Sequence, residues 1–231
     1  LLGTRGSGKT VLLKMLTYSL LKKFNHEQAR SIIDEKKFIG FYVPLHLEFL
    51  DALQNSHATV EEKVNYFQFA FNCSAAKALL DQVVELLLDC YKVKEERFAA
   101  ESYLVDHLTS IWFPDQKSKI NSIRELQWSI EITYNNHDPQ NIHKNTTTQA
   151  FLKPFLIPIT SVLPKITEDL CLDVKNTNWI ICIDEAEFLQ EHFIKCINTF
   201  MRSEKRPLVL KIATLPFKHS TRETLQDNRQ Q

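Results

Sequence analysis

Apolar residues recur along this chain with two different periods, and the period predicts where helices and strands lie. Residues 10–24 and 187–200 carry apolar side chains at helical spacing, with charged residues off the main stripe. Three short runs rich in β-branched and aromatic residues predict buried strands at 38–45, 179–183 and 208–213. Because these strands alternate with helical segments, the pattern favours an α/β fold with a mostly parallel sheet.

The middle of the chain shows helical periodicity and little strand character. Residues 59–111 form a long helix-prone segment, and residues 114–134 predict a further helix. The polar tract 135–149 predicts an exposed loop. Residues 151–172 are apolar but interrupted by three prolines, which predicts two short helices.

This order of segments suggests a core that is interrupted by an insertion. We expect residues 1–54 and 151–231 to form the two parts of a three-layer core, and residues 55–150 to form a helical insertion. With 231 residues, of which 44% are hydrophobic, the chain is long enough for one sizeable domain of this kind.

Composition and charge narrow the classes of function. Lys plus Arg equal Asp plus Glu at 28 each, so no global basic field would steer the chain onto nucleic acid. A local basic patch that binds nucleic acid is still compatible with this balance. The five cysteines are scattered without a Cys-x-x-Cys pair, which is typical of reduced cysteines in a cytoplasmic protein. No apolar stretch approaches the length of a membrane span.

Three of the four glycines gather in one short loop. The loop consists of Gly3, Thr4, Arg5, Gly6, Ser7, Gly8, Lys9 and Thr10. Glycines at this spacing let successive backbone N–H groups curl around phosphate oxygens, as in a P-loop. Lys9 would then neutralise the β- and γ-phosphates of ATP, and Thr10 would offer its hydroxyl to Mg²⁺. A P-loop normally follows a buried strand, of which only Leu1 and Leu2 are in the sequence, so we expect the first strand to be truncated.

Paired acids follow the apolar run 179–183. Parallel sheets bind ligands at the carboxyl ends of their strands, so Asp184 is a candidate to hold Mg²⁺ through water. Glu185 is a candidate to orient and deprotonate an attacking water. The alternative is a strand that runs into an acidic helix cap. We expect Glu187 to face solvent or to cap the next helix.

Two weaker candidates lie near the last predicted strand. Thr214 follows that strand and could touch the γ-phosphate or the attacking water, or could simply end the strand. Arg202, Lys205 and Arg206 precede it and could reach a phosphate in a neighbouring subunit, or could be solvated loop charges. The histidines show no ligand spacing that would favour a metal other than Mg²⁺.

Taken in chain order, the glycine loop, the acidic pair and the Thr214 strand end resemble the Walker A, Walker B and sensor-1 positions of AAA+ ATPases. Within that superfamily the sequence is similar to the origin-recognition or initiator type and to related bacterial signalling ATPases. The resemblance covers residues 1–45 and 155–216. It implies an ATPase with Glu185, Lys9 and Thr214 in catalysis.

The resemblance also implies that the protein acts together with partners. Other classes of P-loop protein can be compared with the same sequence features. Such an ATPase drives a conformational switch in a larger assembly or by self-association, with DNA-linked and defence-signalling roles both open. A transporter-type ATPase needs a glycine-rich signature that Gly40, outside the loop, cannot supply alone, and no guanine-reading motif of a GTPase is present. The open alternatives are a DEAD-box-like helicase core and a nucleotide-binding regulatory module without hydrolysis.

Overall fold

The computed structural model describes most of the chain. The described residues are 1, 4, 7–24, 26–35, 37–45, 47–116, 119–136, 149–170, 172, 177–203, 208–215 and 223–225. Most of the predicted polar loop, at 137–148, lies outside them, as do Gly3, Arg5, Gly6 and Lys205 with Arg206.

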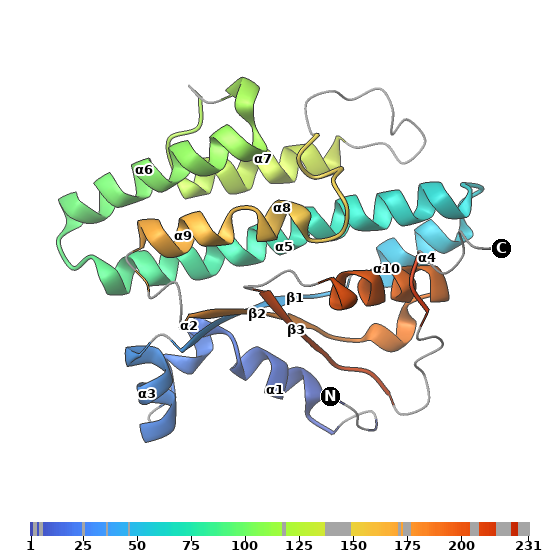
Figure 1. Ribbon diagram of the computed structural model, residues 1–231, viewed down its shortest axis with the longest axis horizontal. Helices are drawn as coiled ribbons and strands as arrows, with labels where there is room; N and C mark the ends of the chain where they lie inside the picture. The colour runs from blue at the N-terminus through green and yellow to red at the C-terminus, as the bar shows by residue number, and fades with distance from the viewer. Residues whose placement is uncertain are drawn as a thin grey trace.

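Three parallel strands form the sheet at the centre of the fold (Figure 1). They are β1 (Phe38–Val43), β2 (Asn178–Ile183) and β3 (Leu208–Ile212), hydrogen-bonded in the order β1-β2-β3. All three coincide with the predicted strands, and β1 ends directly before Pro44, which cannot donate a backbone hydrogen bond to a sheet. The predicted α/β class is therefore confirmed, while the division into 1–54, 55–150 and 151–231 stays a prediction.

A thick helical layer covers one face of the sheet (Figure 1). Next to the sheet lies α5 (Val60–Cys90), whose start is fixed by a capping box between Thr59 and Glu62. The helix-prone segment 59–111 is thus two helices, because the chain reverses at 91–93 before α6 (Lys94–Trp112). The predicted further helix is α7 (Ile123–Asn135), which starts later than expected, after a 3₁₀ turn, and packs with α6 on α5.

The proline-interrupted segment forms two short helices, as predicted. They are α8 (Ile157–Thr160) and α9 (Leu163–Asp169), and they contact α5 and α6 respectively. The fully buried Asn72 of α5 holds the preceding segment in place, because its amide donates to the carbonyls of Phe151 and Lys153 and accepts from the Leu156 nitrogen. One buried amide therefore satisfies three backbone groups of a segment without regular structure.

The other face of the sheet carries α1 (Lys9–Met15) (Figure 1). After it the chain passes the edge of β1 and forms α2 (Tyr18–Leu21), which contacts β1 and α5, and α3 (Glu27–Asp34), which packs on α2. The prediction of one helix over 10–24 is wrong, because the chain leaves the helix at Thr17 and makes a parallel bridge to Gly40 of β1. A side chain at Gly40 would put its Cβ 2.0 Å from the Leu16 carbonyl oxygen, so only glycine permits this close approach.

Two more helices flank the sheet on the side of α5. The first, α4 (Leu47–Asn55), is absent from the sequence-based prediction. The second, α10 (Glu191–Arg202), corresponds to the predicted helix 187–200, but a separate 3₁₀ turn at Ala186–Phe188 precedes it. Phe193 of α10 stacks on Phe67 of α5 with ring centroids 4.5 Å apart, which joins α10 to the main core.

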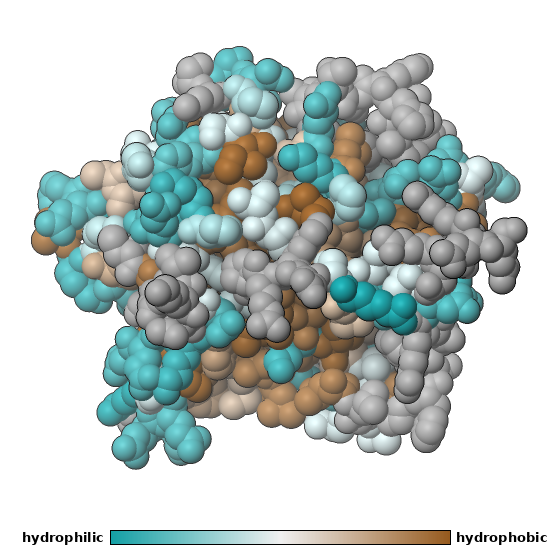
Figure 2. All heavy atoms as spheres, viewed as in Figure 1, coloured by the Kyte–Doolittle hydropathy of each residue, from teal (hydrophilic) through white to brown (hydrophobic). Residues whose placement is uncertain are grey.

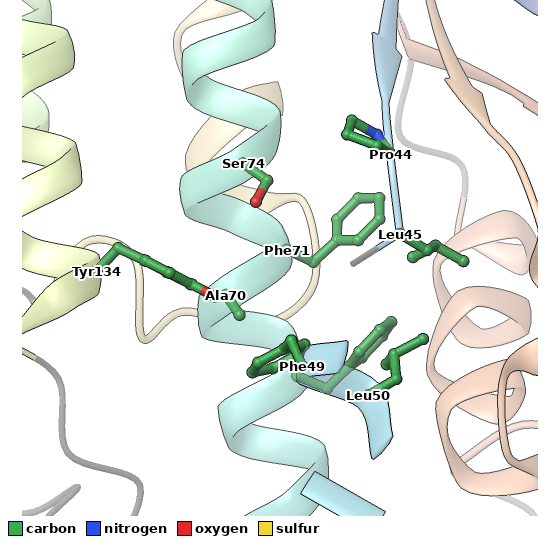
Figure 3. Close-up of a pocket in the computed structure, with 9 residues that line it drawn as sticks. Pro44, Leu45, Phe49, Leu50, Ala70, Phe71, Ser74 and Tyr134 are labelled. Atoms are coloured by element: carbon green, nitrogen blue, oxygen red, sulfur yellow. The ribbon is translucent and has the colours of Figure 1, made fainter. Parts of the chain in front are cut away.

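The small pocket shown in Figure 3 lies within this helical layer. Its volume is about 20 Å³, which is enough for about one water molecule. The lining is mainly apolar and comes from the end of β1 and from α4, α5 and α7: Pro44, Leu45, Phe49, Leu50, Phe67, Ala70, Phe71, Ser74 and Tyr134. A nucleotide does not fit there.

Candidate functional site

The residues singled out at the strand ends meet at one edge of the sheet. Asp184 follows β2 and Thr214 lies two residues after β3, so both are at the carboxyl edge. The Ala213 nitrogen donates to the Ile183 carbonyl (2.9 Å), and the Ala186 nitrogen donates to the Ala213 carbonyl (3.1 Å). The turn that contains Asp184 and Glu185 is therefore fastened to the end of the neighbouring strand.

Leu1, two residues before the glycine loop in the sequence, lies at the same edge. The Leu1 nitrogen donates to the Ile212 carbonyl (2.7 Å), and the Thr214 nitrogen donates to the Leu1 carbonyl (3.1 Å). This pair of bonds has the pattern of a parallel ladder opposite Ala213. Leu1 thus lies beside Thr214, at the edge where Asp184 lies.

The described part of the loop is bonded to itself. The Thr4 carbonyl accepts from the Ser7 nitrogen (3.2 Å) and from the Lys9 ammonium (3.0 Å). Gly8 is the N-cap of α1 with a φ of 80°, a left-handed conformation in which any other residue would be strained. Thr10, in the first turn of α1, is exposed. Lys9 and Thr10 therefore start the helix that lies against the sheet.

Asp184 is buried to an unusual degree for a carboxylate, with 3% of its surface exposed. Its Oδ1 accepts a hydrogen bond from the Glu185 nitrogen (2.9 Å). Its Oδ2 is buried and has no hydrogen-bond partner among the described residues. A buried carboxylate oxygen without a donor is costly, so this atom is suited to a ligand that the protein does not itself contain.

Glu185 stands in a strained backbone conformation. Its φ is 58°, and Leu156 is the other non-glycine residue with a positive φ in the described part of the chain. The left-handed conformation costs about 1 kcal/mol for an ordinary residue and is retained mainly where the surroundings enforce it. The turn leaves Glu185 exposed directly beside the buried Asp184.

Tyr42, near the end of β1, is a neighbour of this site that the sequence analysis missed. Burial, together with the charges of Asp184 and Glu185, raises the pKa of Tyr42 to about 12. The Lys14 ammonium lies over its ring, 5.1 Å from the centroid. A polar side chain near the carboxyl end of a parallel strand was the signal that could have identified it.

Other predicted residues are placed differently or only in part. Glu187 is half-buried and its Oε2 is buried, so the expectation that it faces solvent is wrong. It does not cap the next helix either, because Gln190 is the N-cap of α10. Arg202 is exposed at the end of α10, while Lys205 and Arg206 lie outside the described residues. Thr214 is buried beside Leu1.

Comparison with other proteins adds the family. Among the described residues, no helix is both long enough and apolar enough to span a membrane. Searches of curated proteins and of solved structures gave no match. A family model described as ORC-CDC6-like matches residues 1–231, and the resemblance to initiator-type AAA+ ATPases is thereby confirmed at the level of the family. The chain belongs to the ORC-CDC6-like family.

Proposed function

We propose that this chain binds ATP with Mg²⁺ at the carboxyl edge of the sheet and hydrolyses it. The observation that carries the proposal is the buried Asp184 Oδ2, which has no hydrogen-bond partner among the described residues and lies at the sheet edge that Leu1 also reaches. Family membership supports an ATPase-type role in general. The three-strand sheet would then be part of a P-loop core, in which Leu1 continues the ladder next to β3.

Each residue of the loop has a defined task in this proposal. Backbone N–H groups of residues 3–10 would surround the phosphate oxygens, and the left-handed Gly8 would turn the loop into α1. The Lys9 ammonium, which bonds to the Thr4 carbonyl, is already directed across the loop and would also meet the β- and γ-phosphates. Asp184 and Thr10 would hold Mg²⁺, which neutralises charge on the phosphates.

Hydrolysis is assigned to the strained acidic turn. Glu185 is exposed next to Asp184, so it can accept a proton from an attacking water. Thr214, which is tied to Leu1 by a backbone bond, would sense the γ-phosphate from the adjacent strand end. We propose that this cycle of ATP binding and hydrolysis drives a conformational switch in a larger cytoplasmic assembly.

Nucleotide binding is tested by a matched pair of lysine variants. Lys9→Ala should weaken binding of Mg²⁺-ATP at least about tenfold, because a charge-assisted hydrogen bond contributes about 1.5–3 kcal/mol. Lys37→Ala is the control, because Lys37 is an exposed residue before β1 whose ammonium pairs with Glu35 (2.8 Å) at the opposite end of the strand. Titration with a fluorescent ATP analogue measures both. Equal affinities for the two variants would refute the loop as the phosphate site.

Hydrolysis is tested separately with Glu185→Gln. This variant should bind ATP as the unaltered protein does and release phosphate at least about 100-fold more slowly, since general-base catalysis contributes about 10²–10⁴. Unchanged phosphate release would reject Glu185 as the base. Absence of release from both proteins, with binding intact, would favour the regulatory module without hydrolysis.

A further inference from the structure

Tyr42 and Asp184 project from the same side of the sheet. Tyr42 pairs with Cys182 in the register of β1 and β2, and side chains two residues apart on a strand share a face, which places Asp184 on that side too. It is the side on which α1 lies, since Leu13 packs with Ile180 and Cys182. The phenol, the buried carboxylate and the helix that follows the glycine loop therefore occupy one side of the sheet.

The Tyr42 ring is held in place from two directions. Its apolar part packs against the cluster that contains Leu13, Ile180 and Cys182. From α1, the Lys14 ammonium lies 5.1 Å from the ring centroid, a favourable position for a cation. The Tyr42 side chain is half-buried on the same face of the sheet as Asp184, and its phenolic O–H is a hydrogen-bond donor.

Asp184 needs such a donor. One of its oxygens accepts from the Glu185 nitrogen, and the other is buried without a partner among the described residues. Carboxylates that hold metals are usually oriented by hydrogen bonds from neighbouring residues, and loss of these typically lowers metal affinity about 10–100-fold.

We infer that Tyr42 is a positioning residue for the metal site: when the divalent cation binds, the Tyr42 hydroxyl donates to the Asp184 carboxylate and fixes the orientation in which Asp184 meets the cation. This inference rests on the proposed function, because it assigns Tyr42 a part in the same nucleotide and Mg²⁺ site. Tyr42 should therefore affect the Mg²⁺ concentration that is needed for binding. The affinity for nucleotide in the absence of Mg²⁺ should not depend on it.

The test is a Mg²⁺ titration at a fixed concentration of fluorescent ATP analogue. Tyr42→Phe keeps the ring and removes the hydroxyl, so its unfolding temperature should stay within about 2–4 °C of the unaltered protein. The Mg²⁺ concentration at half-saturation should rise about tenfold, while nucleotide affinity in EDTA should not change. Tyr91→Phe is the matched control, because it removes a phenolic bond to the Asp169 carbonyl (3.2 Å) in the helical layer.

A second background distinguishes a role through Asp184 from a general effect on packing. In Asp184→Asn, the further change Tyr42→Phe should leave the half-saturating Mg²⁺ concentration unchanged, because the two residues act as one unit. The same rise in both backgrounds would overturn the inference, and so would a normal Mg²⁺ response of Tyr42→Phe in the unaltered background. Failure of the unaltered protein to bind ATP in any condition would instead reject the proposed function, and the role of Tyr42 with it.

Discussion

The two faces of the sheet differ in how much apolar surface they bury. On the side of α5, side chains of all three strands join one continuous core that extends through α4 to α10. On the side of α1, the second buried cluster of the described residues consists of Leu13, Ile180, Cys182 and Ala213. Since burial of apolar surface is the main favourable contribution to folding, most of the stability comes from the side of α5.

The thinly covered side carries the groups suited to chemistry. Lys9, Lys14, Tyr42 and Asp184 all belong to it, whereas the pocket of Figure 3 on the other side has room for about one water. The α1 side also leaves β3 partly uncovered, because Val209 is 40% exposed. Figure 2 shows apolar residues gathered over this part of the surface. One face of the sheet therefore contributes most of the packing, whereas the other leaves these polar side chains less covered.

The largest effect is expected on the side of α5. Phe67 is 1% exposed and stacks on Phe155 and Phe193, so Phe67→Ala should lower the free energy of unfolding by about 3–5 kcal/mol. Denaturant unfolding measures it. Phe98→Ala, at a site 54% exposed, should change it by less than about 0.5 kcal/mol. A loss at Phe67 no larger than at Phe98 would contradict the account of where stability resides.

A smaller effect is expected where α1 approaches the sheet. Gly40→Ala would bring a Cβ within 2.0 Å of the Leu16 carbonyl, so the connection between α1 and α2 must move. We expect a loss of about 1–3 kcal/mol in unfolding free energy, as for other overpacked sites.

The same variant should also weaken binding of the ATP analogue, because α1 continues directly from Lys9 and Thr10. Loss of stability with unchanged affinity would show that the position of α1 against β1 does not matter for the loop.

The smallest effect should have the opposite sign. Asp184→Asn removes a buried charge whose Oδ2 has no donor, and should raise the free energy of unfolding without nucleotide by about 1 kcal/mol. Thermal unfolding measures it, with the exposed Asp51→Asn on α4 as the control. A destabilised Asp184→Asn would mean that the carboxylate contributes to the fold and is not held ready for a ligand.

The fold was predictable where local pattern and burial agree. The three strands are short apolar runs with defined ends, so their positions and their parallel arrangement followed from the sequence. The break at Thr17 did not, because it depends on contact with Gly40, which is distant in the sequence. Likewise α4 depends on tertiary packing of Leu50 and Leu53 more than on a strong local signal.

The candidate site was predictable to a similar extent. Residue type and chain order indicated Asp184 and the glycine loop, because the carboxyl edge of a parallel sheet is the usual place for a ligand. The αL backbone of Glu185 and the proximity of Tyr42 require the register between strands, which periodicity alone does not provide. Glu187 was misjudged because an acidic residue after a strand is usually solvated, whereas here it lies in a 3₁₀ turn with its Oε2 buried.

The central claim is that the glycine loop and Asp184 belong to one pocket on the α1 side of the sheet. A crystal structure of the protein with ATPγS and Mn²⁺, with the metal located by its anomalous scattering, tests this directly. We predict phosphates against Lys9 and Thr10 and the metal beside the buried Asp184. Phosphates bound elsewhere, or a metal remote from that carboxylate, would contradict the account.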